Sequence, residues 1–324
     1  MEHALSFVGG LGLLIAGAQL LVSGAVQIAR RLGVSSLLIG LLIGFGTSTP
    51  ELVTSVQGAF RGSPGVALGN VVGSNIANLL LVLGACALLR PIQVESRALK
   101  FDGVVVVCAC LLFALLSLAA PLSRPVGAIY LILLAAYVGW SIKAERRRPK
   151  DRTAPLDRGR AGKDVIPVDR VPRASHGLTF SLSLTLGGLV MILTGAEWVV
   201  DAAMGLAQRL HVSESAIGLT LVALGTSLPE LATSTAATLR RNADVTVGNL
   251  FGSSIYNVLG ITGVTALLSP TEVPAAIAHF GNAVMCTAAV AMFAFAWTGY
   301  RISRREGIVM LALYATYIGV AWHS

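Results

Sequence analysis

The sequence predicts an all-α integral membrane protein whose ten transmembrane helices form two inverted-topology repeats of five helices each. Composition is the first reason, because 55% of the 324 residues are hydrophobic, 12% are charged and the mean hydropathy is +0.76. Soluble domains carry about 25% charged residues, so little of this chain can form one. Internal repetition is the second reason: residues 46–91 align with 225–270 without a gap, with 22 identities in 46 positions.

Apolar runs of about 20 residues, long enough to cross a bilayer, fall into two groups of five. In the first half they cover 5–28, 34–60, 66–89, 101–120 and 125–143. In the second half they cover 177–207, 212–239, 246–268, 278–299 and 306–322. The second and third runs of each group carry Gly, Pro, Ser, Thr and Asn near their middles. This pattern predicts broken second, third, seventh and eighth helices, which line a cavity or pack inside the protein.

A hydrophilic stretch separates the two groups and divides the chain into three parts. It contains ERRRPKDR and several prolines, and residues 143–173 carry 11 Lys or Arg. About 30 residues cannot bury a useful core, so we interpret 144–176 as a flexible linker. The N-terminal repeat is then 1–143 and the C-terminal repeat 177–324.

The positions of Lys and Arg predict the orientation, because cytoplasmic loops of membrane proteins are enriched in these residues. If the linker is cytoplasmic, 21 of the 24 Lys and Arg residues lie inside, and only Arg61, Arg124 and Arg209 lie outside. Both termini are then external. Since each repeat has an odd number of spans, the repeats enter the membrane from opposite sides, an architecture that binds substrate near the midplane.

Each repeat places one glutamate inside a stretch that otherwise matches a membrane span. GTSTPEL contains Glu51, and GTSLPEL contains its counterpart Glu230. An ionisable side chain at that depth is costly unless it meets a partner or a cavity. Pro50 and Pro229, directly before the glutamates, remove a backbone donor and should open each helix and free its carbonyls.

Polar side chains follow the same repeat and supply further oxygens. A threonine lies four residues before each glutamate, and a serine and an asparagine recur four apart in the third and eighth runs: Thr47, Thr226, Ser74, Asn78, Ser253 and Asn257. Residues four apart share one face of a helix. The set contains no thiolate or imidazole, which soft metals prefer, whereas calcium takes six to eight such oxygens and sodium is also a hard ion.

Two ionised glutamates give this site a charge of about −2, which matches one divalent cation. Leaving both charged and empty in a low dielectric is strongly disfavoured. The site should therefore be refilled by calcium, by several monovalent ions or by protons before it reorients, which predicts obligatory exchange.

At these residues the chain resembles the cation/calcium exchanger superfamily, whose two repeats read G-T-S-x-P-[ED] followed by G-S-x-x-x-[ND]. It is most similar to the prokaryotic sodium/calcium exchangers, over both motifs (44–78 and 223–257) and the ten-span layout. The resemblance implies that Glu51 and Glu230 are the principal calcium ligands. It implies further ligands for calcium and sodium in both repeats: Thr47, Ser48, Ser74, Asn78, Thr226, Ser227, Ser253, Asn257 and the carbonyls of Gly44 and Ala223. In this family the first and sixth helices slide past the core.

Three features depart from the repeat or from the family. The segment Ile39–Ser48 is one residue shorter than Ile217–Ser227. Asn257 stands where potassium-dependent relatives carry aspartate, which argues against a potassium requirement. Gln19 aligns with Glu197, so the acid of the sixth span is not shared by the first.

Two pairs of residues keep open interpretations at this point. Glu197 and Asp201, four apart near the outer end of the sixth span, are expected to contact lipid headgroups or the mouth of the ion pathway rather than to ligate an ion. For Asn70 and Asn249, which open the third-span motifs, capping of a helix break and contact with the ion path are equal alternatives.

The function predicted is a secondary antiporter, not an enzyme, that exchanges calcium for sodium by alternating access. It requires no cofactor, no nucleic acid and no obligate protein partner, and its partners are calcium, sodium and the lipid bilayer. The resemblance implies that this bilayer is a prokaryotic inner membrane. Proton/calcium antiport is the main alternative. A cation channel fits a closed central site poorly. An intramembrane hydrolase with two carboxylates as acid and base lacks a nucleophile motif.

Overall fold

The computed structural model describes residues 2–119, 121–146, 177–209 and 223–321. These residues are helical except for short connections and one two-stranded antiparallel ribbon, β1 (Ile92–Gln93) with β2 (Arg301–Ile302). Eight of the described helical segments are long and apolar enough to cross a membrane. The chain is therefore an all-helical membrane protein, as the composition predicted.

The first half runs from α1 to α8. Its helical elements, in which η marks a π-helical turn, are α1 (Glu2–Leu32), α2 (Ser36–Thr47), α3 (Thr49–Phe60), α4 (Pro64–Ile76), η1 (Ala77–Val82), α5 (Leu83–Leu89), α6 (Ser96–Ala98), η2 (Leu99–Gly103), α7 (Val104–Ala119) and α8 (Arg124–Arg146). The final helix, α8, continues three residues into the segment predicted as linker, and the rest of that linker, 147–176, lies outside the described residues.

The second half repeats the order of the first. Its helical elements are α9 (Leu178–Arg209), α11 (Ala223–Thr226), α12 (Leu228–Leu239), α13 (Ala243–Ile255), η5 (Tyr256–Ile261), α14 (Thr262–Leu268), η6 (Ile277–Gly281), α15 (Asn282–Trp297) and α16 (Arg304–Ala321). The predicted seventh span, 212–239, begins outside the described residues. The predicted tenth span is helical as α16, but its first turn carries Arg304, Arg305 and Glu306, so it is not among the eight apolar helices.

The predicted breaks in the second and seventh spans are present at the GTS motifs. Ser48 separates α2 from α3 with φ −80° and ψ 16°, and Ser227 precedes α12 with φ −87° and ψ 2°. Pro50 and Pro229 each lie in the first turn of the helix that follows, where a missing backbone N–H is tolerated. Each glutamate therefore begins a new half-helix inside the bundle.

The prediction that the third and eighth helices are broken is wrong. The helix continues through both motifs, but it widens into a π-helical turn that contains Asn78 or Asn257. In each turn the asparagine carbonyl accepts from the N–H five residues later, at Leu83 and Thr262. An extra residue per turn lets a polar side chain be re-aimed without breaking the helix, and such turns are frequent at functional sites.

Small residues allow α2 and α13 to pack with their backbones in contact. A Cβ added at Gly44 would lie 2.4 Å from the Asn249 carbonyl oxygen, and one added at Gly248 would lie 2.4 Å from that of Leu37. No real Cβ tolerates such distances. The close approach joins the first repeat to the second at the height of the GTS motif.

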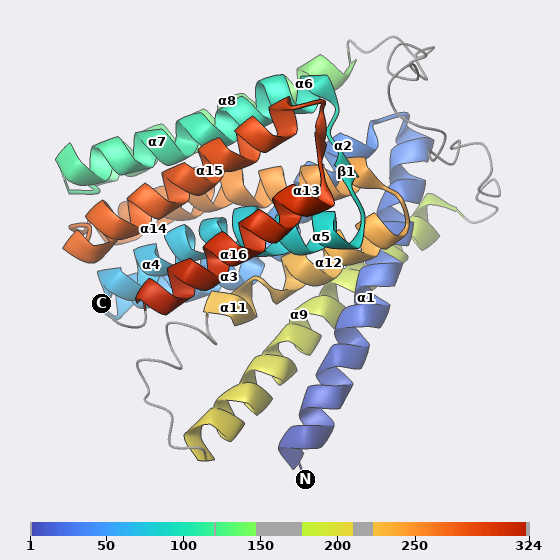
Figure 1. Ribbon diagram of the computed structural model, residues 1–324, viewed down its shortest axis with the longest axis horizontal. Helices are drawn as coiled ribbons and strands as arrows, with labels where there is room; N and C mark the ends of the chain where they lie inside the picture. The colour runs from blue at the N-terminus through green and yellow to red at the C-terminus, as the bar shows by residue number, and fades with distance from the viewer. Residues whose placement is uncertain (1, 120, 147–176, 210–222, 322–324) are drawn as a thin grey trace.

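The long helices α1 and α9 form a second seam between the repeats. Gly10 lies against the Gly195 carbonyl and Gly17 against the Gly188 carbonyl, each 2.8 Å from the position of an added Cβ. The contacts run in opposite directions along the chain, so the two helices are antiparallel. In Figure 1 they lie side by side and lean away from the remaining helices.

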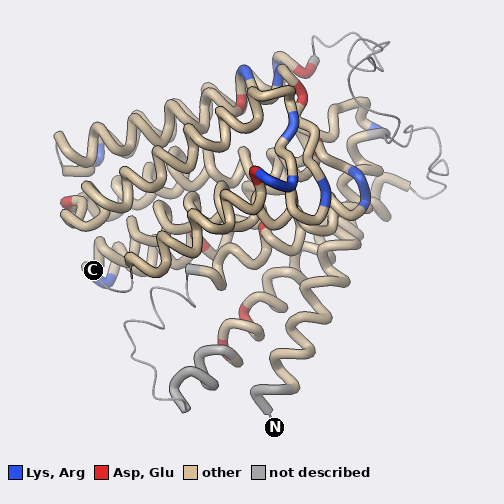
Figure 2. Tube along the Cα trace, viewed as in Figure 1, with Lys and Arg blue, Asp and Glu red and all other residues tan. Residues whose placement is uncertain are grey.

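The remaining helices form a layered bundle around a continuous apolar core. The core takes buried side chains from both repeats, including Leu79 and Leu83 from one and Phe251 and Ile255 from the other. Figure 2 shows that Lys and Arg gather at one end of this bundle, at the ends of the helices drawn on the right. This polarisation matches the loops that the sequence assigned to the basic side.

The α2–α13 seam generates a stability prediction. Gly248→Ala should lower the apparent melting temperature in detergent by about 5 °C, because overpacking costs about 1–3 kcal/mol. Gly187→Ala in α9 is the control, since nothing lies within 4 Å of a Cβ added at Gly187. Thermal unfolding of the two purified variants measures the difference. Equal melting temperatures would show that the seam is loose enough to admit a methyl group.

Candidate functional site

Glu51 and Glu230 lie in the first turns of α3 and α12, and both side chains are fully buried. The first turn of a helix exposes unpaired N–H groups and the positive end of the helix dipole, which favours a carboxylate. Ser48, three residues before Glu51, donates a hydrogen bond from its hydroxyl to Glu230 of the other repeat. The half-helices of the two repeats therefore bring both glutamates into one buried site.

Hydroxyl groups from both repeats converge on Glu230. Ser48 Oγ donates to Glu230 Oε1 at 2.8 Å, and Ser253 Oγ lies 3.2 Å from the same oxygen. Ser253 Oγ also lies 3.1 Å from the carbonyl oxygen of Gly44. The carbonyl of Gly44, which we expected to be free, also accepts the backbone N–H of Ser48. The predicted ligands Ser48, Ser253 and Gly44 thus surround one carboxylate oxygen.

The Glu51 carboxylate accepts fewer hydrogen bonds than that of Glu230. Among the described residues, neither of its carboxylate oxygens has a hydrogen-bond partner, and Glu230 Oε2 is likewise unpaired. Burying a carboxylate without partners costs several kcal/mol. Three buried carboxylate oxygens are therefore available as ligands to a cation.

Threonine and asparagine side chains cross between the repeats in a two-fold arrangement. Thr47 Oγ1 lies 3.3 Å from Asn249 Oδ1, and Thr226 Oγ1 lies 3.3 Å from Asn70 Oδ1. The amide nitrogens of Asn70 and Asn249 donate to Ser55 and Ser234 at 3.0 and 2.9 Å. These asparagines therefore hold the threonines of the opposite repeat in place.

Asn70 and Asn249 have a structural role in addition to the two interpretations left open by the sequence. Asn70 Nδ2 also donates to the carbonyl oxygen of Glu51 at 2.9 Å, so it braces the start of α3 from within the third span. Neither interpretation from the sequence included a contact between the asparagine of one repeat and the threonine of the other. The signal available for it was that both residues recur at the same spacing in the two repeats.

The remaining predicted residues lie in the same region with unpaired polar atoms. Ser74 Oγ is 3.4 Å from Thr226 Oγ1. Both amide atoms of Asn78 and of Asn257, and Ser227 Oγ, are buried without a hydrogen-bond partner in the described part of the chain. Ala223 begins α11 at the edge of the described residues. The donor set is thus carboxylate, hydroxyl and amide oxygen.

The chemistry of these donors selects the kind of ion. Among the described residues no group of three or more His, Cys, Asp or Glu forms a metal cluster, and the described cysteines Cys86, Cys108, Cys110 and Cys286 are free. Oxygen-only sites with two carboxylates suit hard cations such as calcium rather than zinc or copper.

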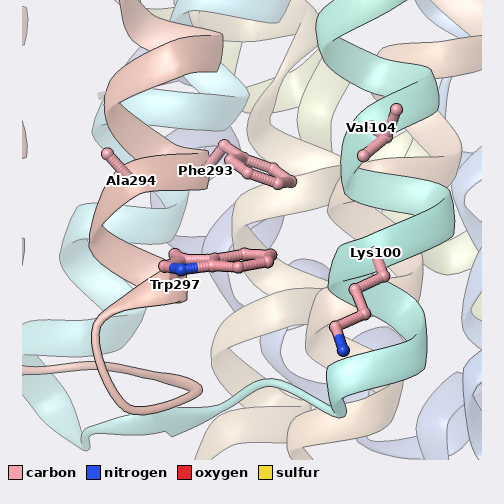
Figure 3. Close-up of a pocket in the computed structure, with 5 residues that line it drawn as sticks. All are labelled: Lys100, Val104, Phe293, Ala294 and Trp297. Atoms are coloured by element: carbon pink, nitrogen blue, oxygen red, sulfur yellow. The ribbon is translucent and has the colours of Figure 1, made fainter.

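A surface groove elsewhere in the molecule has a different character. It lies between η2–α7 and α15 and is lined by Lys100, Val104, Phe293, Ala294 and Trp297 (Figure 3). Its lining is apolar apart from the Lys100 ammonium group, and it contains none of the residues predicted to bind ions. The groove is therefore separate from the carboxylate site.

The fold and the site together define a helical membrane protein in which side chains of two repeats bring carboxylate, hydroxyl and amide oxygens into one buried cluster. The family model described as "Sodium/calcium exchanger protein" matches residues 2–143 and 180–323. The sodium/calcium exchanger MaX1 of Methanosarcina acetivorans is 30% identical over 341 residues, covering 97% of both chains. The inner membrane protein YrbG of Escherichia coli is 34% identical over 266 residues, covering 82% of this chain and 79% of its own length.

A solved structure of the sodium-calcium exchanger NCX_Mj, soaked with Na⁺ and Ca²⁺, superposes with a TM-score of 0.82 at 32% identity and covers 98% of both chains. The chain belongs to the sodium/calcium exchanger protein family.

Repulsion and desolvation in the ion-free site generate a second prediction. Glu51→Gln and Glu230→Gln should each raise the melting temperature of the ion-free protein at alkaline pH, because neutralising one buried charge removes about 1–4 kcal/mol of destabilisation. Thermal unfolding in choline buffer with a chelator measures this. Glu272→Gln, at an exposed carboxylate, is the control and should have no effect. Ion-free variants no more stable than the parent would show that the two charges are compensated.

Proposed function

We propose that this protein is a secondary antiporter that exchanges calcium for sodium across the membrane by alternating access. The observation that carries the proposal is the pair of buried glutamates, one from each repeat, with three carboxylate oxygens that have no hydrogen-bond partner among the described residues. Membership of the family and the names of its relatives support the choice of ions.

In this proposal Glu51 and Glu230 are the principal calcium ligands, and neutral oxygens complete the shell. Ser48 and Ser253 hold Glu230, and the unpaired amides of Asn78 and Asn257 are available to a second ion. The full proposed ligand set is Glu51, Glu230, Thr47, Thr226, Ser48, Ser227, Ser74, Ser253, Asn78, Asn257 and the carbonyls of Gly44 and Ala223.

The charge of the site accounts for coupling. Two carboxylates balance one calcium ion, and neutral oxygens around them can instead hold a small group of sodium ions. The empty, doubly charged site is costly to bury. The protein therefore changes between its outward-open and inward-open conformations only when an ion is bound. Exchange rather than leakage follows from this penalty.

The proposed topology has ten spans, with 1–143 and 177–324 as inverted repeats, both termini external and 144–176 as a cytoplasmic linker. The antiparallel α1–α9 seam supports the inversion, and the separate family matches to 2–143 and 180–323 support the division. The gathering of Lys and Arg at one end of the bundle supports the orientation (Figure 2).

Ion coupling is tested by calcium flux in proteoliposomes. An imposed sodium gradient should drive calcium uptake in choline medium, without potassium and with a protonophore present, because Asn257 adds no third charge. Glu51→Gln and Glu230→Gln should abolish this flux and serve as negative controls. Flux that requires potassium, or that stops when only the proton gradient is collapsed, would exclude sodium coupling and favour proton/calcium antiport.

Adjacent serines offer a matched pair of variants for the ligand set. Ser253→Ala should raise the calcium concentration for half-maximal flux by about tenfold, because it removes a hydroxyl that lies on Glu230 Oε1. Ser254→Ala changes the neighbouring buried hydroxyl, which has no recorded bond to either glutamate, and should stay within about twofold. Equal effects of both changes would mean that Ser253 acts only through packing.

The topology gives a prediction for the linker. A cysteine introduced at Arg158, in a background without the native cysteines, should resist an impermeant external thiol reagent in intact cells and react after permeabilisation. Replacing 150–168 by a short flexible spacer should leave exchange within about twofold, since so short a polar segment holds no core. External labelling would reverse the topology, and loss of exchange would assign the linker a role in transport.

A further inference from the structure

Arg240 makes a polar connection between the end of α12 and α1, one of the two long helices. The residue directly follows α12, the half-helix that carries Glu230. Its guanidinium group donates from Nε to Gln19 Oε1 and from a terminal nitrogen to Ser23 Oγ, both in the middle of α1. Ser23 Oγ itself donates to the Gln19 carbonyl at 2.6 Å. Arg240, Gln19 and Ser23 are called the α12 latch below.

The repeat supplies a counterpart for every member of the α12 latch. Arg240 corresponds to Arg61 at the offset of 179 residues. On the long helices the offset is 178, because the segment before the first GTS motif is one residue shorter; Gln19 then corresponds to Glu197, and Ser23 to Asp201. The counterpart set therefore has two carboxylates where the α12 latch has an amide and a hydroxyl.

The two arginines occupy equivalent structural positions. The N–H of Arg61 donates to the Gln57 carbonyl at 3.0 Å, and that of Arg240 to the Ala236 carbonyl at 3.1 Å. The next residue is left-handed in both cases, with φ 66° at Gly62 and 61° at Arg241. Both half-helices thus end in the same way, with an arginine as the first residue after the helix.

Only one of the two sets is joined in this structure. Arg61, Glu197 and Asp201 are all exposed, and no hydrogen bond or ion pair connects Arg61 to either carboxylate. Packing shows the same asymmetry, since α1 lies along α12, whereas the described parts of α9 and α3 make no comparable contact. The structure has one end of the core closed onto the long helices.

We propose that Arg61 closes onto Glu197 and Asp201 in the alternative conformation, as Arg240 now closes onto Gln19 and Ser23. Inverted repeats alternate access by exchanging the conformations of their two halves around a fixed site. The glycine seam at Gly10–Gly195 and Gly17–Gly188 lets α1 and α9 move as one unit. Such a movement breaks the α12 latch and forms the counterpart.

The difference in charge gives the two latches different properties. The α12 latch joins a cation to neutral groups, whereas the Arg61 latch joins a cation to two carboxylates, and charge-assisted bonds are the stronger kind. The alternative conformation is therefore stabilised more than a symmetric repeat would allow, and its population falls with ionic strength. Glu197 and Asp201 act as positioning residues for the transport cycle and not as ion ligands. This inference rests on the proposed alternating access.

Crosslinking tests the proposal in the full-length protein. The positions are changed in pairs to cysteine, in a background in which Cys86, Cys108, Cys110 and Cys286 are replaced by alanine: Ser23 with Arg240, and Asp201 with Arg61. A short bis-methanethiosulfonate reagent is used, because an arginine side chain reaches farther than a direct disulfide allows. Ser23 paired with Arg61 is the control, since the proposal joins these positions in neither conformation.

We expect the Ser23/Arg240 pair to crosslink in this conformation and the Asp201/Arg61 pair to crosslink under exchanging conditions. Either crosslink should stop calcium–sodium exchange, and a reducing agent should restore it. If the uncrosslinked variants exchange but Asp201/Arg61 crosslinks no more than the Ser23/Arg61 control, the latch is wrong while the antiport function stands. If no uncrosslinked variant exchanges, although the cysteine-free parent does, the arginines are required beyond a latch and the proposal fails.

Substitutions that remove one charge distinguish a latch from a general attraction between cations and the exposed carboxylates Glu197 and Asp201. Arg240→Gln and Arg61→Gln should shift the ratio of the two conformations in opposite directions by about tenfold. The rate of crosslinking measures this shift, with the Asp201/Arg61 pair in the Arg240→Gln variant and the Ser23/Arg240 pair in the Arg61→Gln variant. Glu197→Gln with Asp201→Asn should act in the direction of Arg61→Gln and remove the salt dependence. Shifts in the same direction for both arginine variants would overturn the proposal.

Discussion

Placing two carboxylates in a low-dielectric interior is the constraint on which the rest of the structure depends. Glu51 and Glu230 are fully buried, and of their four carboxylate oxygens only Oε1 of Glu230 has a hydrogen-bond partner among the described residues. Keeping both groups ionised there is costly unless cations or protons neutralise them. The half-helix starts at Ser48 and Ser227 lessen the penalty, because each directs N–H groups and a positive dipole end toward a carboxylate.

The repeats satisfy this constraint by crossing, since neither could do so alone. Ser48 of the first repeat binds Glu230 of the second, and the threonine of each repeat meets the asparagine of the other. Any movement of one repeat against the other therefore alters the shell around both glutamates. In the proposed antiport, an ion bound at this site therefore contacts both repeats. Such contact is what coupling between ion binding and the change from one open side to the other requires.

Two glycine seams divide the molecule into parts with different freedom. Between α2 and α13, carbonyl groups of one helix occupy the space of missing side chains on the other, which fixes the core that holds the site. Between α1 and α9, glycines seven residues apart make a smooth antiparallel contact. A buried apolar cluster packs the long pair against α2, α12 and α13, and Arg240 adds polar contacts to α1 at one end.

The sequence by itself determined the class of fold, the limits of the long apolar helices and the identity of the two glutamates, because these follow from composition and from an exact repeat. It also indicated the breaks at Pro50 and Pro229, since proline acts locally. Only the tertiary structure decided that the third and eighth spans widen into π-helical turns, that Asn70 and Asn249 brace the opposite threonines, and that Arg240 meets α1. The contacts of Asn70, Asn249 and Arg240 join residues more than 150 positions apart, which no local pattern encodes.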